Sequence, residues 1–217
     1  MFNGPTQHAS DVDSIMFFII AVSVGFLVIV TVAMIYFIFR YNKKRHPQAR
    51  DVKESAILEV VWIAIPTILV LFMFYFGLQS FYGIREIPAD ASNIKVIGRM
   101  WQFSYAYPNG KKSDTLFLAK GKNYKLDLIT TDVNHSFFIP AYRIKEDLSA
   151  GKTNYMVLKP AETGEFDIAC SEYCGLNHSK MYSKLIVLEE NQYNEWLNQG
   201  INKNTDSTKT TNAAEKK

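Results

Sequence analysis

The chain has 217 residues, of which 48% are hydrophobic and 21% are charged, and its formal net charge is +3. These averages would suit a soluble globular protein, but the apolar residues gather in two long uncharged segments, which excludes a single soluble domain. Most of the excess positive charge lies in one short segment and not along a binding face, so nothing indicates a nucleic-acid partner.

The first uncharged segment covers residues 15–39 and follows an N-terminal stretch, residues 1–14, that carries Asp11 and Asp13. As a helix it would be about 37 Å long, which is enough to cross a hydrocarbon core of about 30 Å. A buried core helix would rarely lack charge over such a length. A secretory signal peptide is disfavoured because no basic residue precedes the apolar run. We therefore predict a transmembrane helix at residues 15–39.

Residues 40–56 contain six basic side chains, and a second apolar segment at 57–82 includes the uncharged stretch 60–78. Short basic segments next to membrane spans stay on the cytoplasmic or matrix side. We therefore predict a second transmembrane helix at 57–82, with Pro66 as a possible kink, and an out–in–out topology. The N-terminus and the C-terminal part would then lie outside the cytoplasm or matrix.

The pattern then changes to short β-like runs between turn signals, which predicts an all-β antiparallel sandwich or barrel over residues 93–200. Residues 191–197 are expected to form a short closing helix, and residues 201–217 a disordered tail. The predicted strands are Ile94–Ile97, Trp101–Tyr107, Thr115–Ala119, Tyr124–Thr130, Asn154–Lys159, Glu165–Cys170 and Lys184–Leu188.

Two cysteines, the only two in the chain, lie close together in the β region. Three residues separate Cys170 from Cys174, three more precede His178, and Met181 follows within the same short loop. His135, the other histidine of this region, lies just beyond a predicted strand. These five side chains are candidate metal ligands.

Several chemistries fit this cluster. A disulfide would explain the cysteines but give no role to the histidines or Met181. A zinc site with two cysteines and two histidines gives no role to the methionine. Covalent haem attachment is excluded because it needs two residues between the cysteines. A mononuclear blue-copper site needs only one cysteine. Two copper ions bridged by both thiolates would use every group, and we favour that interpretation.

At these residues the chain closely resembles subunit II of haem–copper cytochrome c oxidases, over roughly residues 10–200. The resemblance implies a two-helix hairpin followed by a cupredoxin-like domain that holds the dinuclear CuA centre. Cys170 and Cys174 would bridge the coppers, and His135 and His178 would each complete one ion. The remaining weak ligands would be Met181 and the backbone carbonyl of Glu172. The Glu172 carboxylate would also reach a magnesium ion shared with subunit I.

Three other segments match the same family. Residues 58–66 resemble the start of its second helix, where Glu59 would be the entrance of a proton pathway, although a solvated helix-end acid is an equal alternative. Residues 98–105 resemble its aromatic stretch, where Trp101 would receive electrons, although aromatic strands are often simple core. Residues 135–140, followed by Lys145 and Asp147, resemble the segment that packs on subunit I.

The resemblance implies the electron-accepting subunit of a terminal respiratory oxidase. It would take electrons from a cytochrome c-type donor and pass them to haem in subunit I, where oxygen is reduced to water with proton pumping. Subunit III is a further expected partner. The expected location is a bacterial plasma membrane or the mitochondrial inner membrane, with the copper domain on the periplasmic or equivalent outer side.

Other classes fit less well. A quinol oxidase subunit II lacks the copper ligands that this chain has, and thiol chaperones favour an α/β pattern that residues 93–200 do not show. One departure from the family concerns the donor. Arg99, Lys111 and Lys112 occupy the stretch where acidic side chains usually attract a lysine-rich cytochrome c. We therefore expect a neutral or acidic donor, or a membrane-bound cytochrome.

Overall fold

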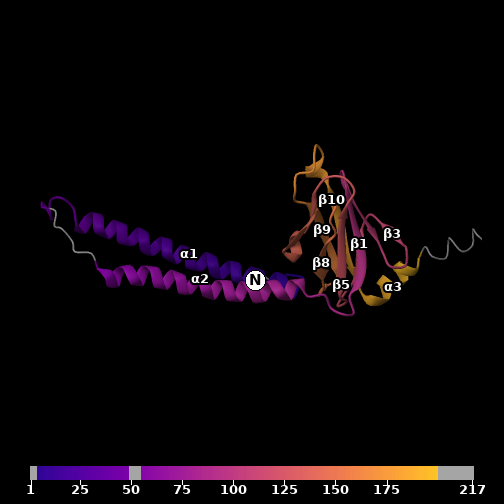
Figure 1. Ribbon diagram of the computed structural model, residues 1–217, viewed down its shortest axis with the longest axis horizontal. Helices are drawn as coiled ribbons and strands as arrows, with labels where there is room; N and C mark the ends of the chain where they lie inside the picture. The colour runs from indigo at the N-terminus through magenta and orange to yellow at the C-terminus, as the bar shows by residue number, and fades with distance from the viewer. Residues whose placement is uncertain (1–3, 49–54, 200–217) are drawn as a thin grey trace, which may run out of the picture. The chain divides into compact units, whose positions relative to one another are not determined.

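The computed structural model describes residues 4–48 and 55–199. They form two compact units, one made of residues 14–84 and the other of residues 4–13 together with 85–199 (Figure 1). The predicted tail at 201–217 and the central part of the basic segment 40–56 lie outside the described residues.

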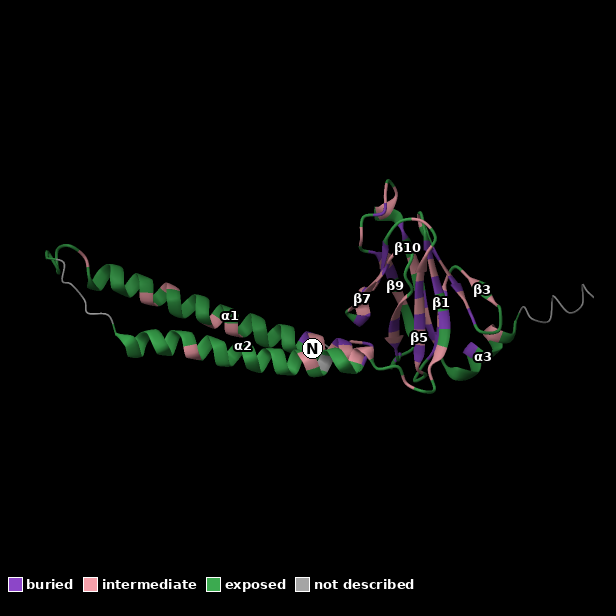
Figure 2. Cartoon of the chain, in the orientation of Figure 1, coloured by how far each residue is buried: buried purple, intermediate pink, exposed green. Residues whose placement is uncertain are grey.

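Two long helices carry the apolar segments. Helix α1 covers Gln7–Arg40 and helix α2 covers Ala56–Arg85, and their apolar side chains are exposed along nearly the whole length (Figure 2). Within the part of the chain that the structure describes, both are long and apolar enough to cross a membrane. Apolar surfaces this large are not left in water, so this exposure agrees with the two predicted transmembrane helices.

Both helices begin earlier than the predicted spans because polar side chains cap them. The Thr6 hydroxyl accepts a hydrogen bond from the backbone N–H of Ala9 at 3.1 Å, and the Ser55 hydroxyl accepts one from Leu58 at 3.4 Å. Such caps satisfy backbone donors that would otherwise lack a partner. Pro66 lies inside α2, where the Thr67 hydroxyl donates to the carbonyl of Ile63 at 2.7 Å.

The second unit is a sandwich of two five-stranded sheets (Figure 1). One sheet has the order β3-β2-β1-β5-β8 and the other the order β4-β10-β9-β6-β7. The predicted sandwich is confirmed, but β1 with β5 and β4 with β10 pair in parallel. The strands are β1 Ser92–Arg99, β2 Gln102–Ala106, β3 Lys112–Ser113, β4 Leu116–Ala119, β5 Tyr124–Thr130, β6 His135–Ile139, β7 Ile144–Leu148, β8 Asn154–Leu158, β9 Gly164–Cys170 and β10 Tyr182–Leu188.

Three strands were missed by the sequence pattern: β3, β6 and β7. Strand β6 is buried at four of its five positions, so it lacks the polar–apolar alternation by which a half-buried strand is recognised. His135 therefore begins β6 and does not trail β5. Trp101, predicted to start a strand, lies instead with Met100 in the turn between Arg99 and Gln102.

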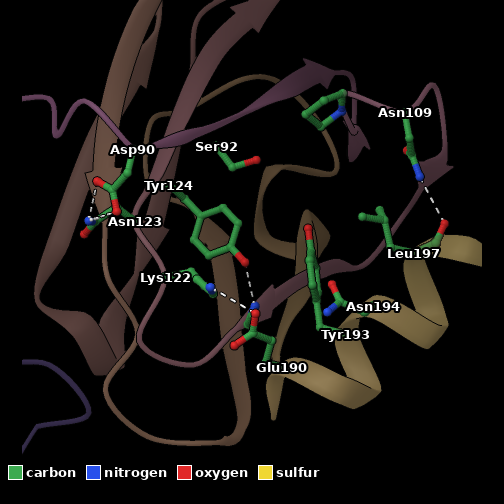
Figure 3. Close-up of a pocket in the computed structure, with 12 residues that line it drawn as sticks. Asp90, Ser92, Asn109, Lys122, Asn123, Tyr124, Glu190, Tyr193, Asn194 and Leu197 are labelled. Carbon is green, nitrogen blue, oxygen red and sulfur yellow. Dashed lines mark hydrogen bonds and ion pairs between the residues drawn. The ribbon is translucent and has the colours of Figure 1, made fainter.

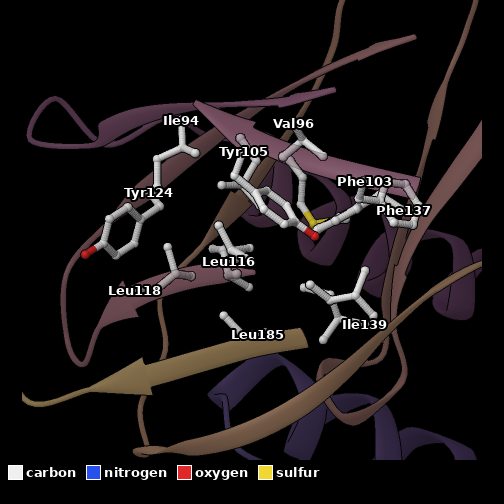
Figure 4. Packing of buried hydrophobic residues seen from close by; sticks show 14 of the residues in the cluster. Ile94, Val96, Phe103, Tyr105, Leu116, Leu118, Tyr124, Phe137, Ile139 and Leu185 are labelled. Atoms are coloured by element: carbon white, nitrogen blue, oxygen red, sulfur yellow. The ribbon is translucent and has the colours of Figure 1, made fainter. Parts of the chain in front are cut away.

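The core lies between the two sheets, where alternate residues of the facing strands interdigitate (Figure 4). Burying each large side chain contributes about 1.5–3 kcal/mol. Phe137 illustrates the packing. Its ring meets the rings of Phe103 and Tyr105 edge-on, with distances of 5.4 Å and 6.2 Å between ring centres. Helix α3, Glu190–Asn198, closes one side, with Trp196 stacked on Phe117 at 4.2 Å.

The first residues of the chain belong to this same unit. The Pro5 carbonyl accepts a hydrogen bond from the backbone N–H of Ala161 at 3.1 Å. The buried Asp13 carboxylate pairs with Arg143 at 2.9 Å. At the other boundary, Arg85 pairs with Glu146 at 2.7 Å. The unit is therefore held by contacts far apart in the sequence as well as by its sheets.

Candidate metal centre

Five predicted ligands converge at one end of the sandwich. Cys170 is the last residue of β9, Cys174 lies in the following loop, and His178 begins the short 3-10 helix η2, His178–Lys180. Met181 directly precedes β10, and its backbone carbonyl accepts a hydrogen bond from Cys170 at 3.1 Å. The β9–β10 pairing thus closes the loop. His135 reaches it from β6, which neighbours β9.

The donor atoms form a continuous chain of close contacts. The Sγ atoms of Cys170 and Cys174 lie 3.7 Å apart. His135 Nδ1 is 3.9 Å from the Cys170 sulfur, and His178 Nδ1 is 3.6 Å from the Cys174 sulfur. The Met181 thioether is 3.8 Å from the Cys174 sulfur, and the Glu172 carbonyl oxygen is 3.3 Å from the Cys170 sulfur.

The two cysteines are free thiols, because a disulfide would bring their sulfurs to about 2.0 Å. Two sulfurs that share a metal ion at about 2.3 Å each must lie within about 4.6 Å of one another, and the 3.7 Å separation meets this limit. His135, Cys170 and Cys174 are all buried, and their donor atoms lie within 4.8 Å of one another. The arrangement therefore fits a bridged metal pair and argues against the disulfide.

Burial disfavours the thiolate form of Cys174. It raises the pKa of Cys174 to about 11, and the neighbouring Cys170 adds to the shift by hydrogen bonding and charge repulsion. Two adjacent thiolates are therefore unfavourable in this apolar place without a cation between them. Soft metal ions bind thiolate, imidazole and thioether together, and copper is the metal of electron-transfer sites with this set.

Asp132, which the sequence interpretation missed, orients His135. Its carboxylate accepts a hydrogen bond from His135 Nε2 at 2.8 Å, which leaves Nδ1 directed at the Cys170 sulfur. Desolvation would raise the pKa of Asp132, but hydrogen bonds from the backbone of Met100, from His135 and from the backbone of Val133 outweigh it and hold the pKa at about 2. Carboxylates commonly fix the ring of a metal-binding histidine in this way.

Gly98 also shapes the site. A Cβ atom at this position would lie 2.8 Å from a Leu148 methyl carbon and 3.3 Å from the imidazole carbon Cδ2 of His135. The glycine thus leaves the space that the His135 ring occupies. The sequence signal for Asp132 was its position three residues before a candidate histidine ligand, whereas nothing in the sequence marked Gly98.

The backbone carbonyl and the side-chain carboxylate of Glu172 have different surroundings. Its carbonyl faces the Cys170 sulfur, whereas its partly exposed carboxylate pairs with Lys145 at 2.7 Å. This ion pair lowers the pKa of Glu172. A magnesium ion at the carboxylate would therefore have to replace or join Lys145.

Trp101 is partly buried and packs against the core where the candidate ligands lie. Its indole Nε1 donates a hydrogen bond to the carbonyl of Cys174 at 3.3 Å. Gly175 packs on the same ring and has φ +119°, a conformation that favours glycine. Trp101 is therefore joined to the backbone of a candidate ligand.

Two other residues of interest lie elsewhere. Glu59 is exposed in the first turn of α2, which belongs to the other unit. The Lys111 ammonium donates to the carbonyls of Trp196 and Gln199 at the end of α3 and lies 3.8 Å from the centre of the Trp196 ring. Lys111 therefore caps a helix, and its ammonium group is held at the end of α3.

A separate pocket of about 330 Å³ lies between α3 and the first residues of β5 (Figure 3). Tyr124 and Tyr193 line it, and Lys122 pairs with Glu190 at its rim at 3.0 Å. Asp132 follows the opposite end of β5, so this pocket takes no part in the metal cluster.

The chain resembles known proteins over both of its units. Residues 3–81 match the family described as cytochrome C oxidase subunit II, transmembrane domain, and residues 111–190 match its periplasmic domain. The alternative cytochrome c oxidase subunit 2 of Bradyrhizobium diazoefficiens is 31% identical over 76% of this chain and 72% of its own length. Cytochrome c oxidase subunit 2 of Alkalihalophilus pseudofirmus is also 31% identical, over 82% of this chain and 56% of its own length.

Solved structures show the same fold. The periplasmic domain of subunit II of cytochrome oxidase from Bradyrhizobium japonicum superposes with a TM-score of 0.51 at 29% identity, covering 54% of this chain and 99% of that domain. A chain of a haem–copper terminal oxidase dimer, 20% identical, superposes with a TM-score of 0.50 and covers 60% of this chain and 99% of its own. The second likeness supports the fold alone.

Proposed function

The chain belongs to the cytochrome c oxidase subunit II family, and on that premise we propose that it is the subunit through which electrons enter its oxidase. As a member of this family it is a subunit of a terminal oxidase. It is also a membrane protein with two apolar helices and a cupredoxin-like domain outside the cytoplasm. Its association with subunit I follows from the same membership.

One observation carries the proposal: six donor groups from two distant segments meet at one buried place. We assign them as the ligands of two copper ions, a pair that would supply one-electron transfer when bound. Cys170 and Cys174 would hold both ions, and His135 and His178 would each hold one. Met181 and the Glu172 carbonyl are the weak ligands.

Residues of this chain hold the metal ligands in place and connect them to the side that faces the electron donor. Trp101 faces the donor and is connected by its indole N–H to the carbonyl of Cys174. Asp132 holds the His135 ring, and the sandwich holds both ends of the ligand loop, so the donor set changes little when the charge of the centre changes. We assign the donor as a cytochrome c-type protein and the acceptor as haem in subunit I, where oxygen is reduced to water with proton pumping.

Other assignments rest on the family resemblance. We propose Glu59 as the entrance of a proton pathway and the Glu172 carboxylate as a ligand of a magnesium ion shared with subunit I. Subunit III is a proposed partner. We retain the out–in–out topology, with spans at 15–39 and 57–82, the loop 40–56 inside, and the copper domain at 93–200.

The test measures copper in the purified full chain. The wild type is expected to bind two copper ions, to become purple, and to give a multi-line mixed-valence EPR signal. Cys170→Ser and Cys174→Ser should each abolish the multi-line signal, because a bridge is lost. Ser179→Ala, an exposed position in the same loop, is the matched control and should behave as the wild type.

The outcomes separate the remaining chemistries. A chain that stays colourless and EPR-silent after copper loading, or one that prefers zinc, would refute the copper assignment. A single copper with a four-line signal would point to a mononuclear blue site and would refute the bridged pair.

A further inference from the structure

The surface around Trp101 is unusually apolar for a loop region. Leu176 is 87% exposed and Tyr173 is 81% exposed, although both lie between metal ligands in the sequence. Met100 and Val133 are 46% and 40% exposed. Large exposed apolar side chains that gather in one place mark a surface that binds another molecule.

Contacts and chain neighbours place these four side chains at the same site. Asp132 accepts a hydrogen bond from the backbone N–H of Met100 at 2.7 Å, and Val133 follows Asp132 directly. Leu176 follows Gly175, which packs on Trp101. The Tyr173 ring lies 5.8 Å from the imidazole of His178. We call Met100, Val133, Tyr173 and Leu176, together with Trp101, the docking face.

The acidic side chains beside this face are already engaged. Asp132 accepts hydrogen bonds from His135 and Met100, and Glu172 pairs with Lys145. Lys145 balances the charge of Glu172. Asp132 keeps its negative charge, but its side chain is only 23% exposed and is directed at His135 and the backbone of Met100.

The cations beside the face are not neutralised. Arg99 directly precedes Met100, and its guanidinium lies beside the neutral side-chain amide of Gln102. Lys180 ends the short helix that His178 begins, and it is exposed. Across residues 4–48 and 55–199, no carboxylate forms an ion pair with Arg99 or Lys180.

A neighbouring groove carries mixed charge and contributes little selectivity. Lys112, Asp114 and Lys184 line it, and Lys184 pairs with Glu165 and Asp167 at 2.9 Å. The cations of the docking-face segments that form no ion pair in the described residues are therefore Arg99, beside Met100, and Lys180, in the ligand loop.

Building on the proposed function, we propose that the docking face binds a haem protein whose surface around the haem edge is apolar and acidic, and that Arg99 and Lys180 select it. Tyr173 is the expected anchor, since Tyr is enriched among the residues that dominate binding energy, and Leu176 adds apolar contact area. The two cations steer it and repel a donor with a lysine-rich face, because charge complementarity acts mainly on encounter and on the choice of partner.

The experiment compares two probes that share one fold and one haem: a lysine-rich cytochrome c, and the same protein with its lysines succinylated. Binding of each to the full chain in an uncharged detergent is measured as a dissociation constant over a series of salt concentrations. We expect the succinylated form to bind about tenfold more tightly at low salt, and this advantage to fade as salt screens the charges.

The variants test the assigned residues. Arg99→Glu with Lys180→Glu should reverse the preference between the two probes. Lys159→Glu should leave it unchanged, since Lys159 is exposed and follows β8 at the end that pairs with the start of β5, away from the cluster. Leu176→Ser with Tyr173→Ser should weaken binding of both probes while keeping their order. Circular dichroism of each variant confirms that the fold is intact.

Two results would overturn this inference: tighter, salt-sensitive binding of the unmodified lysine-rich cytochrome, or a double charge reversal with no more effect than Lys159→Glu. A separate measurement tests the proposed function. In a stopped-flow experiment, the copper-loaded chain is mixed with a reduced probe that it binds, and the oxidation of the ferrous haem by one electron is followed over time. Selective binding without that transfer would uphold the docking face but refute the electron-accepting role.

Discussion

Asp132 and His135 form a hydrogen bond of 2.8 Å across a tight turn, and the same carboxylate accepts the backbone N–H of Met100 at 2.7 Å. One acidic side chain therefore fixes both a candidate copper ligand and the turn that carries Trp101. The position of Trp101 and the orientation of the His135 ring are thus coupled through a residue that touches no metal.

Asp132→Asn should disturb the metal site without unfolding the domain. An amide at this position keeps the shape of the side chain but binds the His135 N–H less strongly, so we expect copper affinity to fall by about 10- to 100-fold. Competition with a copper chelator measures the affinity, and the EPR hyperfine pattern reports the histidine. Asp167→Asn, an exposed position on β9, is the control. Equal affinity in the two variants would show that Asp132 has no positioning role.

Trp101→Phe should slow electron transfer while leaving the copper ions in place. The change removes the N–H that bonds the Cys174 carbonyl, and loss of such a positioning contact costs up to about 100-fold in rate. The readouts are the stopped-flow rate with a reduced cytochrome and the copper content. Trp196→Phe makes the same substitution in α3, where the ring stacks on Phe117, and should change stability but not rate. A similar slowing in both variants would contradict the role of Trp101.

Met181→Leu should change the reduction potential but not the number of bound coppers. The two side chains have similar volume, so the buried substitution should cost less than about 1.5 kcal/mol, whereas loss of the weak thioether ligand alters the potential. Redox titration of the visible absorption measures the shift. Met156→Leu is the matched control, because Met156 is also buried but belongs to the core between the sheets. If both variants keep the wild-type potential, Met181 is a packing residue.

Asp13→Ala should loosen the attachment of the first residues to the β unit. The carboxylate is 3% exposed and accepts two hydrogen bonds from the guanidinium of Arg143, and losing a hydrogen bond to a charged group costs about 1.5–3 kcal/mol. Thermal unfolding followed by near-UV circular dichroism measures the loss. Asp11→Ala removes only an exposed contact with Gln7 and should have no comparable effect. Equal melting temperatures for the two variants would argue against the anchor.

The folded domain should lose stability steeply above about pH 10. Burial raises the pKa of Tyr105, Tyr107, Tyr142 and Tyr193 above the ordinary value. Their stabilisation is therefore complete below about pH 10, and above it each costs about 1.4 kcal/mol per pH unit, because only the unfolded chain releases the proton. Tyrosinate absorption from these groups should appear together with the loss of circular dichroism. Full ionisation in a still-folded protein would contradict this prediction.

Much of the candidate site could be predicted because its signal is local. Cys170, Cys174, His178 and Met181 lie within twelve residues, and two antiparallel strands, β9 and β10, hold the ends of that segment. Spacing along the chain therefore fixed which of these side chains could meet. The same holds for the two apolar helices, since length and the absence of charge suffice to predict a membrane span.

Other features depended on contacts between distant segments. Strand β6 carries no alternation because both of its faces are covered, so its existence and the exact placement of His135 followed only from packing. Lys111 looked available to a partner until α3, some 85 residues later, presented its carbonyls to the ammonium group. In the same way, Gly98 matters only because His135 and Leu148 pack against it.

The sequence by itself thus determined the membrane hairpin, the all-β class and most of the donor set. Hydrophobic patterning, charge and short spacing along the chain are enough to predict each of them. Only the tertiary structure decided that the two cysteines are free thiols 3.7 Å apart, that Asp132 orients His135, and that neither Arg99 nor Lys180 forms an ion pair within the part of the chain that the structure describes. The physical reason is that hydrogen bonds, ion pairs and burial join groups in space, and the chain order does not specify which distant groups will meet.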